Sequence, residues 1–226
     1  GGDVVEAELL LVAVGRGPVT EGLGFDEQGV EMERGFVRTD ERCRTNLEGV
    51  YAVGDIVPGL QLAHRGFQQG IFVAEDIADL DLEKAQAAAE EIAGLEPTPI
   101  DETGIPRVTY SHPEVASVGL DEATARATYG DDLVETLTYD LGGNGKSQIL
   151  KTQGFVKLVR RTDGPVVGVH MVGDRVGELI GEAQLIYGWE AHAEDVAPLV
   201  HAHPTQNEAL GEAHLALAGK ALHAHS

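Results

Sequence analysis

The sequence predicts an α/β region followed by an α+β domain with an antiparallel sheet. Two near-continuous apolar runs, at residues 7–14 and 49–56, have the pattern of strands buried on both faces. A helical pattern follows at 62–77, which we expect to pack on the sheet. From residue 104 onward the pattern changes to short alternating strands with mostly local connections, which is typical of an antiparallel sheet.

The first apolar run, Ala7 to Val14, ends in a turn at Gly15-Arg16-Gly17-Pro18. A strand of this kind needs neighbours to pair with, and no βα unit precedes it. We therefore interpret it as the last strand of a domain whose earlier part lies outside this chain.

The second run, Gly49 to Ile56, ends in Gly54-Asp55. Open α/β sheets bind ligands at the carboxyl ends of their strands, and a carboxylate there suits a ribityl or ribose hydroxyl. Gly54 would let a ligand approach the backbone. The alternative is a turn in which Asp55 caps a helix.

The helix expected after this strand would bury one apolar face and turn the amides of its first turn toward a cofactor. A further helix or linker is expected at 81–92, and the Gly- and Pro-containing stretch 94–99 closes the first region. The predicted buried face consists of Ala63, Phe67, Ile71, Ala74 and Ile77.

The second domain is predicted to be complete. Its strands are expected at 107–110, 115–119, 133–139, 155–160 and 166–172, with a tight turn at Asp163-Gly164-Pro165 before the last strand. Helices are expected at 121–129, 176–187 and 204–218, with the segment 193–200 between the last two.

The composition excludes several classes of protein. Asp and Glu number 38 and Lys and Arg 16, which gives a net charge of −22 and argues against nucleic acid or an anionic membrane as partner. A basic protein partner fits this charge, although a solvated acidic surface would also explain it. No apolar run is long enough to span a membrane, and no signal peptide opens the chain, so we expect the cytoplasm.

The cysteine and histidine contents limit the chemistry. Cys43 is the only cysteine, so this chain contains neither a disulfide nor a redox dithiol. Of the nine histidines, six follow residue 190. None of them forms the i, i+4 pair with a carboxylate that a zinc motif would show, so no metal site is predicted.

The strongest candidate site is the stretch His201-Ala202-His203-Pro204-Thr205-Gln206-Asn207-Glu208. A histidine titrates near neutral pH, and a carboxylate that binds one ring nitrogen makes the other a better proton acceptor. Pro204 suits the first position of a helix, so His203 would project from the start of that helix with Glu208 on its next turn. The alternative is a structural histidine before an ordinary helix.

Three motifs together resemble the C-terminal half of the flavin disulfide reductases. They are Val14-Gly15-Arg16-x-Pro18, Tyr51-Ala52-Val53-Gly54-Asp55 and His203-Pro204-Thr205-x-x-Glu208, in the order and approximate spacing of that family. The fuller strings Leu62-Ala63-His64 and His201-Ala202-His203-Pro204-Thr205 look most like the dihydrolipoamide dehydrogenase (E3) branch of actinobacterial type. The resemblance runs the whole length of the chain.

The resemblance implies the ends of two Rossmann-like domains, for NAD at 1–18 and for FAD at 19–98, followed by an interface domain at 104–226. It implies that Gly54 and Asp55 bind the ribityl and phosphate region of FAD, and that the backbone of Leu62, Ala63 and His64 lies by the isoalloxazine ring. Gly15 would contact NAD. His203 would be the acid/base for dihydrolipoamide, with Glu208 holding its imidazole.

The same resemblance implies a homodimer, and as a partner the lipoyl-bearing acyltransferase component of 2-oxo acid dehydrogenase complexes, whose basic subunit-binding domain an acidic surface would suit. The N-terminal FAD motif, the Gly-rich NAD loop and the redox cysteine pair of the family are not in this sequence, and Cys43 matches neither redox cysteine. We therefore expect this chain alone to be inactive, as part of a longer enzyme or a proteolysed or designed dimerisation piece.

Two alternatives stay open at this point. Glutathione, mycothiol and mercuric reductases share the His-Pro and Gly-Asp motifs. The chain could also be a module that dimerises without flavin.

Overall fold

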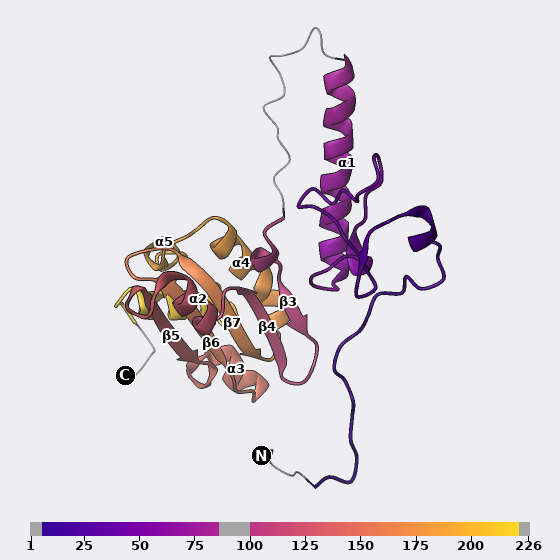
Figure 1. Ribbon diagram of the computed structural model, residues 1–226. Helices are drawn as coiled ribbons and strands as arrows, with labels where there is room; N and C mark the ends of the chain where they lie inside the picture. The colour runs from indigo at the N-terminus through magenta and orange to yellow at the C-terminus, as the bar shows by residue number, and fades with distance from the viewer. Residues whose placement is uncertain (1–5, 86–99, 222–226) are drawn as a thin grey trace. The chain divides into compact units, whose positions relative to one another are not determined.

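The computed structural model describes residues 6–85 and 100–221, and the side chains within these ranges except those of 78–85. The chain divides into two compact units, Gly1–Ile100 and Asp101–Ser226, which are described separately below (Figure 1).

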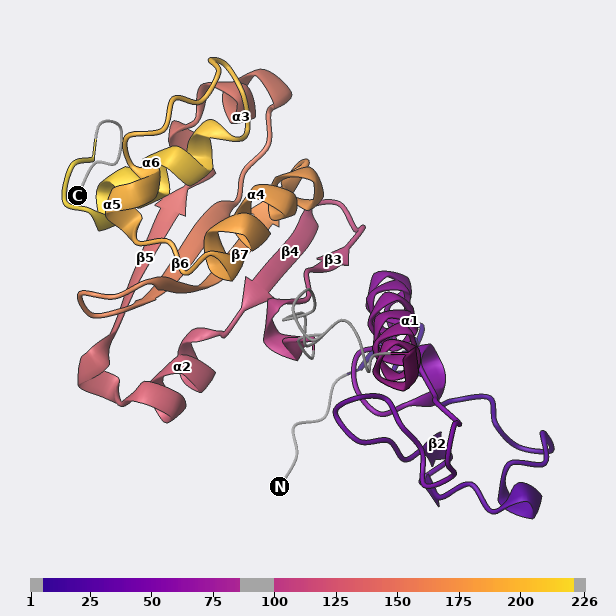
Figure 2. The same ribbon diagram turned by 90° about the horizontal axis from the view of Figure 1, so that it is seen from above.

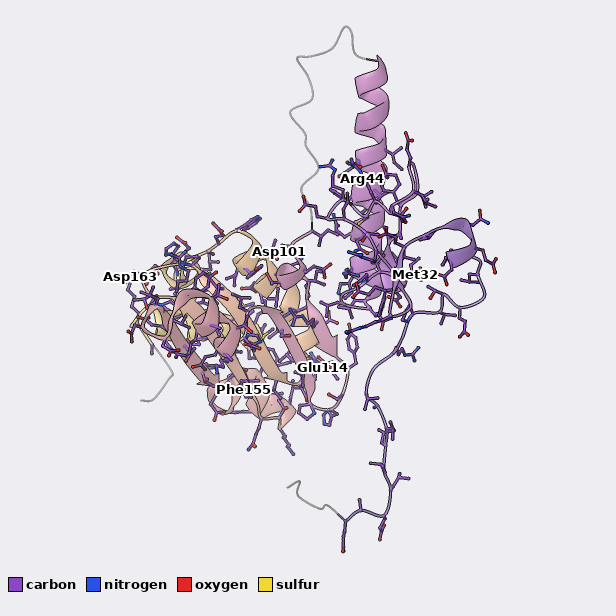
Figure 3. All side chains as sticks on the ribbon, in the orientation of Figure 1. Met32, Arg44, Asp101, Glu114, Phe155 and Asp163 are labelled. Carbon is purple, nitrogen blue, oxygen red and sulfur yellow. The ribbon has the colours of Figure 1, made fainter. Side chains whose placement is uncertain are left out.

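The second unit is built on a five-stranded sheet in the order β3-β4-β7-β6-β5, with every neighbouring pair antiparallel. All five strands predicted from the alternating pattern are confirmed. Glu114 and Phe155 both begin strands at one end of the sheet, and Asp163 lies in the β6–β7 turn at the other end (Figure 3). The strands are β3 (Arg107–Thr109), β4 (Glu114–Gly119), β5 (Val134–Asp140), β6 (Phe155–Arg161) and β7 (Val166–Gly173).

Helices cover both faces of this sheet (Figure 2). On one face α4 (Val176–Gly188) packs on β4 and β7, and α6 (Glu208–Leu217) packs on β5 and β6. Buried side chains of these helices and of the strands beneath them form the main core, which includes Leu158, Met171 and Leu210. On the other face α2 (Glu122–Tyr129) closes a smaller core. The shorter elements are α3 (Gly145–Leu150), α5 (Ala193–Val196), η3 (Glu102–Gly104), η4 (Asp131–Leu133) and η5 (Leu141–Gly143).

The predicted helix at 204–218 begins later than expected, at Glu208. Residues 204–207 form a loop because their polar groups bond outside a helix. The Thr205 amide donates to Glu208 Oε2 at 2.7 Å, and the Gln206 side chain turns inward to the Asp174 carbonyl and to Ser147. In the segment 193–200 only Ala193–Val196 forms a helix, and neither this helix nor α3 was predicted.

The first unit contains one long helix and little sheet. β1 (Met32–Glu33) and β2 (Phe36–Val37) pair in an antiparallel hairpin. The unit also contains η1 (Asp26–Gln28), η2 (Gly54–Ile56) and α1 (Ala63–Ala85). A small core includes Val37, Ala52 and Val57.

The two strands predicted to be buried in this unit do not form. Residues 7–14 have no regular structure, and Leu9 and Leu11 are 85% and 82% exposed. An apolar strand is buried only where strands flank it, and no strand in the described residues pairs with this segment. At 49–56 only a single bridge, Arg44 to Tyr51, is present before η2.

The helix predicted from residue 62 is confirmed, but its predicted buried face is wrong. Phe67 and Ile71 are 71% and 51% exposed, whereas Arg65, Gln69, Phe72 and Asp76 are buried. Polar side chains occupy this face because distant loops supply their partners. Residues 86–92 of the second predicted helix and the expected boundary at 94–99 lie outside the described residues.

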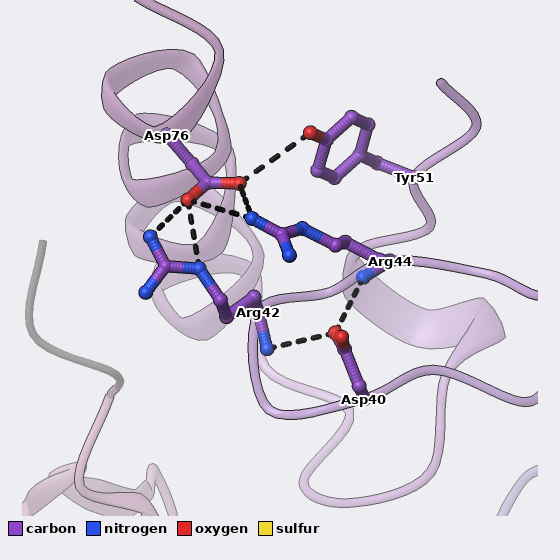
Figure 4. Close-up of polar contacts among 5 residues, drawn as sticks. All are labelled: Asp40, Arg42, Arg44, Tyr51 and Asp76. Carbon is purple, nitrogen blue, oxygen red and sulfur yellow. Dashed lines mark hydrogen bonds and ion pairs between the residues drawn. The ribbon is translucent and has the colours of Figure 1, made fainter. Parts of the chain in front are cut away.

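Asp76 illustrates this arrangement (Figure 4). Its carboxylate is 1% exposed and accepts hydrogen bonds from the guanidinium groups of Arg42 and Arg44 and from Tyr51 Oη at 3.4 Å. Burial acts to raise the pKa of Asp76, but the bonds and charges of Arg42 and Arg44 outweigh it and lower that pKa. The cluster ties the loop 40–51, which leads to Gly54, onto α1.

Candidate functional site

His203 and Glu208 form a hydrogen-bonded pair in the second unit. His203 Nδ1 lies 2.8 Å from Glu208 Oε1, and Glu208 Oε2 accepts the Thr205 amide. The His203 side chain is 75% exposed and that of Glu208 only 22%. When Nδ1 carries the proton that Glu208 accepts, Nε2 is the nitrogen left to take a proton from a ligand.

The surroundings keep Glu208 ionised. Burial acts to raise the pKa of its carboxyl, but the bonds from the Thr205 amide and from His203 outweigh this and lower that pKa. Tyr139, which is 4% exposed, stays neutral nearby because burial, with the charges of Glu212 and Glu208, raises its pKa to about 12. Glu208 is therefore a permanently charged acceptor at neutral pH, suited to hold an imidazole.

A second imidazole–carboxylate pair lies in the same loop. His201 Nε2 is 2.8 Å from Glu182 Oε1 of α4, and the Asn207 side-chain amide donates to Glu182 Oε2. The His201 side chain is only 12% exposed. His201 belongs to the predicted motif, but no partner was predicted for it. Glu182 lies 19 residues earlier on another helix, and no local pattern connects the two.

The N-terminus of α3 supports the loop from its other side. Asn144 donates to the Thr205 carbonyl at 3.1 Å, and Ser147 Oγ donates to Gln206 Oε1 at 2.9 Å. A Cβ at Gly145 would lie 3.4 Å from His203 Cε1, so the imidazole rests against this glycine. Asn144, Gly145 and Ser147 were not among the predicted site residues, and the only local signal was Asn144, a residue type that caps helices.

An open groove of about 840 Å³ runs alongside the loop. Its walls carry both cationic and anionic side chains and a short apolar stretch, Leu199 and Val200, which are 58% and 98% exposed. The charged and polar lining includes Lys146, Arg175, Glu178, Glu182, His201 and Asn207.

Five of the predicted cofactor residues come together in the first unit. Gly54 has φ 77°, open space where a Cβ would stand, and an amide that donates to Gln69 of α1 at 2.8 Å. Asp55 is exposed, and its carbonyl accepts from Gln61 just before α1. Ala63 and His64 are exposed in the first turn of that helix, directly after Leu62.

This arrangement fits part of a dinucleotide site. The first turn of α1 contains no acidic residue, so its amides can face a phosphate. The exposed Asp55 carboxylate offers acceptors for hydroxyl groups. Gly15, the predicted NAD residue, has φ 115° in a segment without regular structure, and a Cβ there would meet nothing within 4 Å. The structure does not bring Gly15 to the other predicted residues.

No group of three or more His, Cys, Asp or Glu side chains in 6–85 and 100–221 could hold a metal ion. In the same part of the chain, no helix is both long enough and apolar enough to cross a membrane.

Comparison with known families matches both units. Residues 105–214 match the family model described as the pyridine nucleotide-disulphide oxidoreductase dimerisation domain, and residues 1–70 match the pyridine nucleotide-disulphide oxidoreductase model. Dihydrolipoyl dehydrogenase from Bacillus subtilis is 40% identical over 97% of this chain. The chain belongs to the dihydrolipoyl dehydrogenase-like pyridine nucleotide-disulphide oxidoreductases.

Other relatives agree with this assignment to the oxidoreductase family. The mitochondrial dihydrolipoyl dehydrogenase of Pisum sativum is 36% identical over 97% of the chain, and that of Corynebacterium glutamicum 35% over 96%. The chain spans 43%, 41% and 44% of the Bacillus, Pisum and Corynebacterium proteins. Because the Bacillus relative is at least as similar as the Corynebacterium one, these identities do not single out the expected actinobacterial type.

Two solved structures share the fold of this chain. LpdA from Mycobacterium tuberculosis superposes with a TM-score of 0.75 at 24% identity, covering 89% of this chain and 41% of that one. The flavoprotein disulfide reductase RclA from Escherichia coli gives 0.76 at 19% identity, covering 91% and 44%. The expected fold class, a partial nucleotide-binding region followed by an α+β dimerisation domain, is confirmed.

Proposed function

We propose that this chain forms the C-terminal part of a dihydrolipoyl dehydrogenase, in which His203 is the acid/base and Glu208 holds its imidazole. The observation that carries the proposal is the 2.8 Å contact between His203 Nδ1 and Glu208 Oε1, on an imidazole whose other edge is exposed. Glu208 is fixed in turn by the Thr205 amide. The relatives named above support the choice of dihydrolipoamide as substrate.

In this reaction His203 Nε2 takes the proton of a substrate thiol. Glu208 stabilises the imidazolium that forms, since its carboxylate is already ionised and hydrogen-bonded. The substrate thiolate then attacks a disulfide sulfur, forming a mixed disulfide and releasing an enzyme thiolate. The sequence contains a single cysteine, so this disulfide must come from other residues, and we propose that the chain alone does not turn over.

The residues of the first unit would hold part of the cofactors. Asp55 would accept hydroxyl groups of the FAD ribityl chain, with Gly54 giving close access to the backbone. The backbone of Leu62, Ala63 and His64 would border the isoalloxazine ring, and Gly15 would contact NAD. FAD, when bound, accepts the electron pair of the dithiol and passes it to NAD as hydride.

The test uses the holoenzyme that contains this chain. His203→Gln should lower kcat for dihydrolipoamide-dependent NAD reduction by a factor on the order of 10²–10⁴, the usual contribution of an acid/base. Oxidation of NADH by ferricyanide needs the flavin but no thiol proton, so it should be unchanged. Full dihydrolipoamide activity in His203→Gln would refute the assigned role.

A second candidate function, homodimer formation, is favoured by the match of 105–214 to a dimerisation domain. Sedimentation of the 226-residue chain should give a dimer, whereas a monomer at tens of micromolar would count against it. The net charge of −22 supports docking of a basic subunit-binding domain on that dimer. The affinity of the dimer for this domain should fall steeply as the salt concentration rises. An affinity that does not change with salt would exclude charge as the basis of binding.

A further inference from the structure

The loop that carries His203 is fastened on both sides of that residue by one carboxylate. Glu182 Oε1 receives His201, two residues before His203, and Glu182 Oε2 receives Asn207, four residues after it. Because Glu182 lies in the middle of α4, whose Leu179, Ala183 and Ile186 are buried in the main core, this anchor is rigid.

We propose that His201 and Glu182 are a positioning pair, which aims His203 without exchanging protons with the substrate. This inference rests on the proposed acid/base function of His203. The His203 side chain is 75% exposed and has Glu208 as its hydrogen-bond partner, so its direction depends on the backbone of the loop. The loop backbone is held by the bonds of His201 and Asn207 to Glu182. The hydrogen bonds of Thr205 and Gln206 hold it further.

Both nitrogens of His201 face other groups of the protein. Nε2 is engaged by Glu182, and the Nδ1 edge faces α6, where a Cβ on Gly211 would lie 2.6 Å from Nδ1 and 2.9 Å from Cε1. Gly211 is buried and lies in the interior of α6, where alanine would otherwise be preferred. The glycine therefore makes room for the imidazole of His201.

The two imidazoles of the loop thus have different environments and different roles. His203 is exposed and faces outward, with a partner from its own loop and helix start. His201 is 12% exposed and reaches back to another helix. Its pair with Glu182 lines the groove at one side of the loop, so a shift of this pair would move the groove wall and His203 together.

The experiment compares variants of the holoenzyme under two assays, dihydrolipoamide-dependent NAD reduction and NADH oxidation by ferricyanide. His201→Leu and Glu182→Leu remove the tie and should lower kcat for dihydrolipoamide roughly 10- to 100-fold, since misplacement by about 1 Å costs that much. KM and the ferricyanide rate should stay within about twofold of the wild type, because the tie serves the orientation of His203.

Two further variants separate positioning from chemistry and from folding. His201→Gln keeps a donor for Glu182, so it should recover most of kcat and keep the shape of the pH profile. Gly211→Ala displaces the imidazole without removing an ionisable group, so it should reproduce the loss. Its matched control is Gly181→Ala on α4, where a Cβ would meet nothing within 4 Å, and this variant should keep full activity.

The outcomes discriminate between the two proposals. If His203→Gln keeps dihydrolipoamide activity, the proposed function fails. If His203→Gln is impaired while His201→Leu and Gly211→Ala match the wild type, only the positioning inference is overturned. The positioning inference is also overturned if His201→Gln is as impaired as His203→Gln and loses a limb of the pH profile. A third contrary outcome is a proportional fall of the dihydrolipoamide and ferricyanide rates in His201→Leu and Gly211→Ala.

Discussion

Glu208 binds the His203 imidazole through Oε1 and the Thr205 amide through Oε2, so one carboxylate fixes both the side chain and the backbone of the loop. It is the first residue of α6, a helix that packs on β5 and β6. Glu208 therefore holds His203, the candidate base, in a fixed position relative to the core of the second unit.

Glu208→Gln should lower kcat of the holoenzyme for dihydrolipoamide by roughly 10- to 100-fold, less than His203→Gln, because His203 keeps its place in the chain but loses an ionised partner. Steady-state rates of both variants provide the measurement. Glu212→Gln, on the next turn of α6, is the control for the lost charge. A Glu208→Gln enzyme as fast as the wild type would show that the pair is structural.

Asp76→Asn should loosen the attachment of loop 40–51 to α1. Two guanidinium groups would lose a buried carboxylate, at a cost on the order of 1–3 kcal/mol, discounted because both arginines can turn to water. Trypsin cleavage after Arg42 and Arg44 in the 226-residue chain should accelerate roughly tenfold or more. Glu75→Gln, an exposed neighbour on α1, removes the same charge and should leave the rate unchanged; equal rates in both variants would contradict the role given to Asp76.

His214 should make the second unit sensitive to mild acid. It is completely buried, with Nδ1 2.7 Å from the Leu210 carbonyl, and burial lowers its pKa below the ordinary 6.5. As the pH falls, His214 is therefore protonated in the unfolded state before it is protonated in the folded state. The stability that its neutral form contributes is complete above about pH 6.5 and decreases as the pH falls from there toward the folded-state pKa.

Replacing this histidine by leucine should reduce that loss, and urea unfolding of the chain at several pH values measures it. The difference in unfolding free energy between His214→Leu and the wild type should be constant above pH 7 and shift in favour of the leucine variant as the pH falls below about 6.5. Curves that stay parallel over the whole range would contradict the depressed pKa.

Gly66→Ala should disturb the cofactor side of the first unit, because a Cβ at 66 would lie 3.3 Å from Gly54 Cα. Gly70, one turn later on α1, has open space, and Gly70→Ala is a matched control with the same gain of up to about 1 kcal/mol in helix propensity. Flavin content of the purified holoenzyme should fall in Gly66→Ala and stay full in Gly70→Ala. Equal content in both would remove the support for Gly54 as a contact of FAD.

The sequence allowed the second unit to be predicted almost strand by strand, since alternation in β4 or β6 reflects the local contrast between a buried and an exposed face. It did not show the buried face of α1, because Gln69 and Asp76 are buried by partners far away in the chain, Gly54 and Arg42. The apolar run at 7–14 is a strand pattern without strands beside it among the described residues.

The candidate site likewise contains some residues that the local sequence pattern predicts and others that only the fold brings together. His203 and Glu208 lie five residues apart, and their types and spacing could be interpreted locally. Glu182 and Ser147, which support the loop, are 19 and 59 residues away from their partners His201 and Gln206, and only the fold brings them together.

The most direct test of the central claim is the reductive half-reaction in single turnover. Stopped-flow absorbance of the oxidised holoenzyme mixed with dihydrolipoamide measures the rate at which the flavin and disulfide are reduced, and mixing with NADH measures reduction from the other side. We predict that His203→Gln slows the first by a factor on the order of 10²–10⁴ and leaves the second unchanged. A rate with dihydrolipoamide equal to that of the wild type would contradict the account.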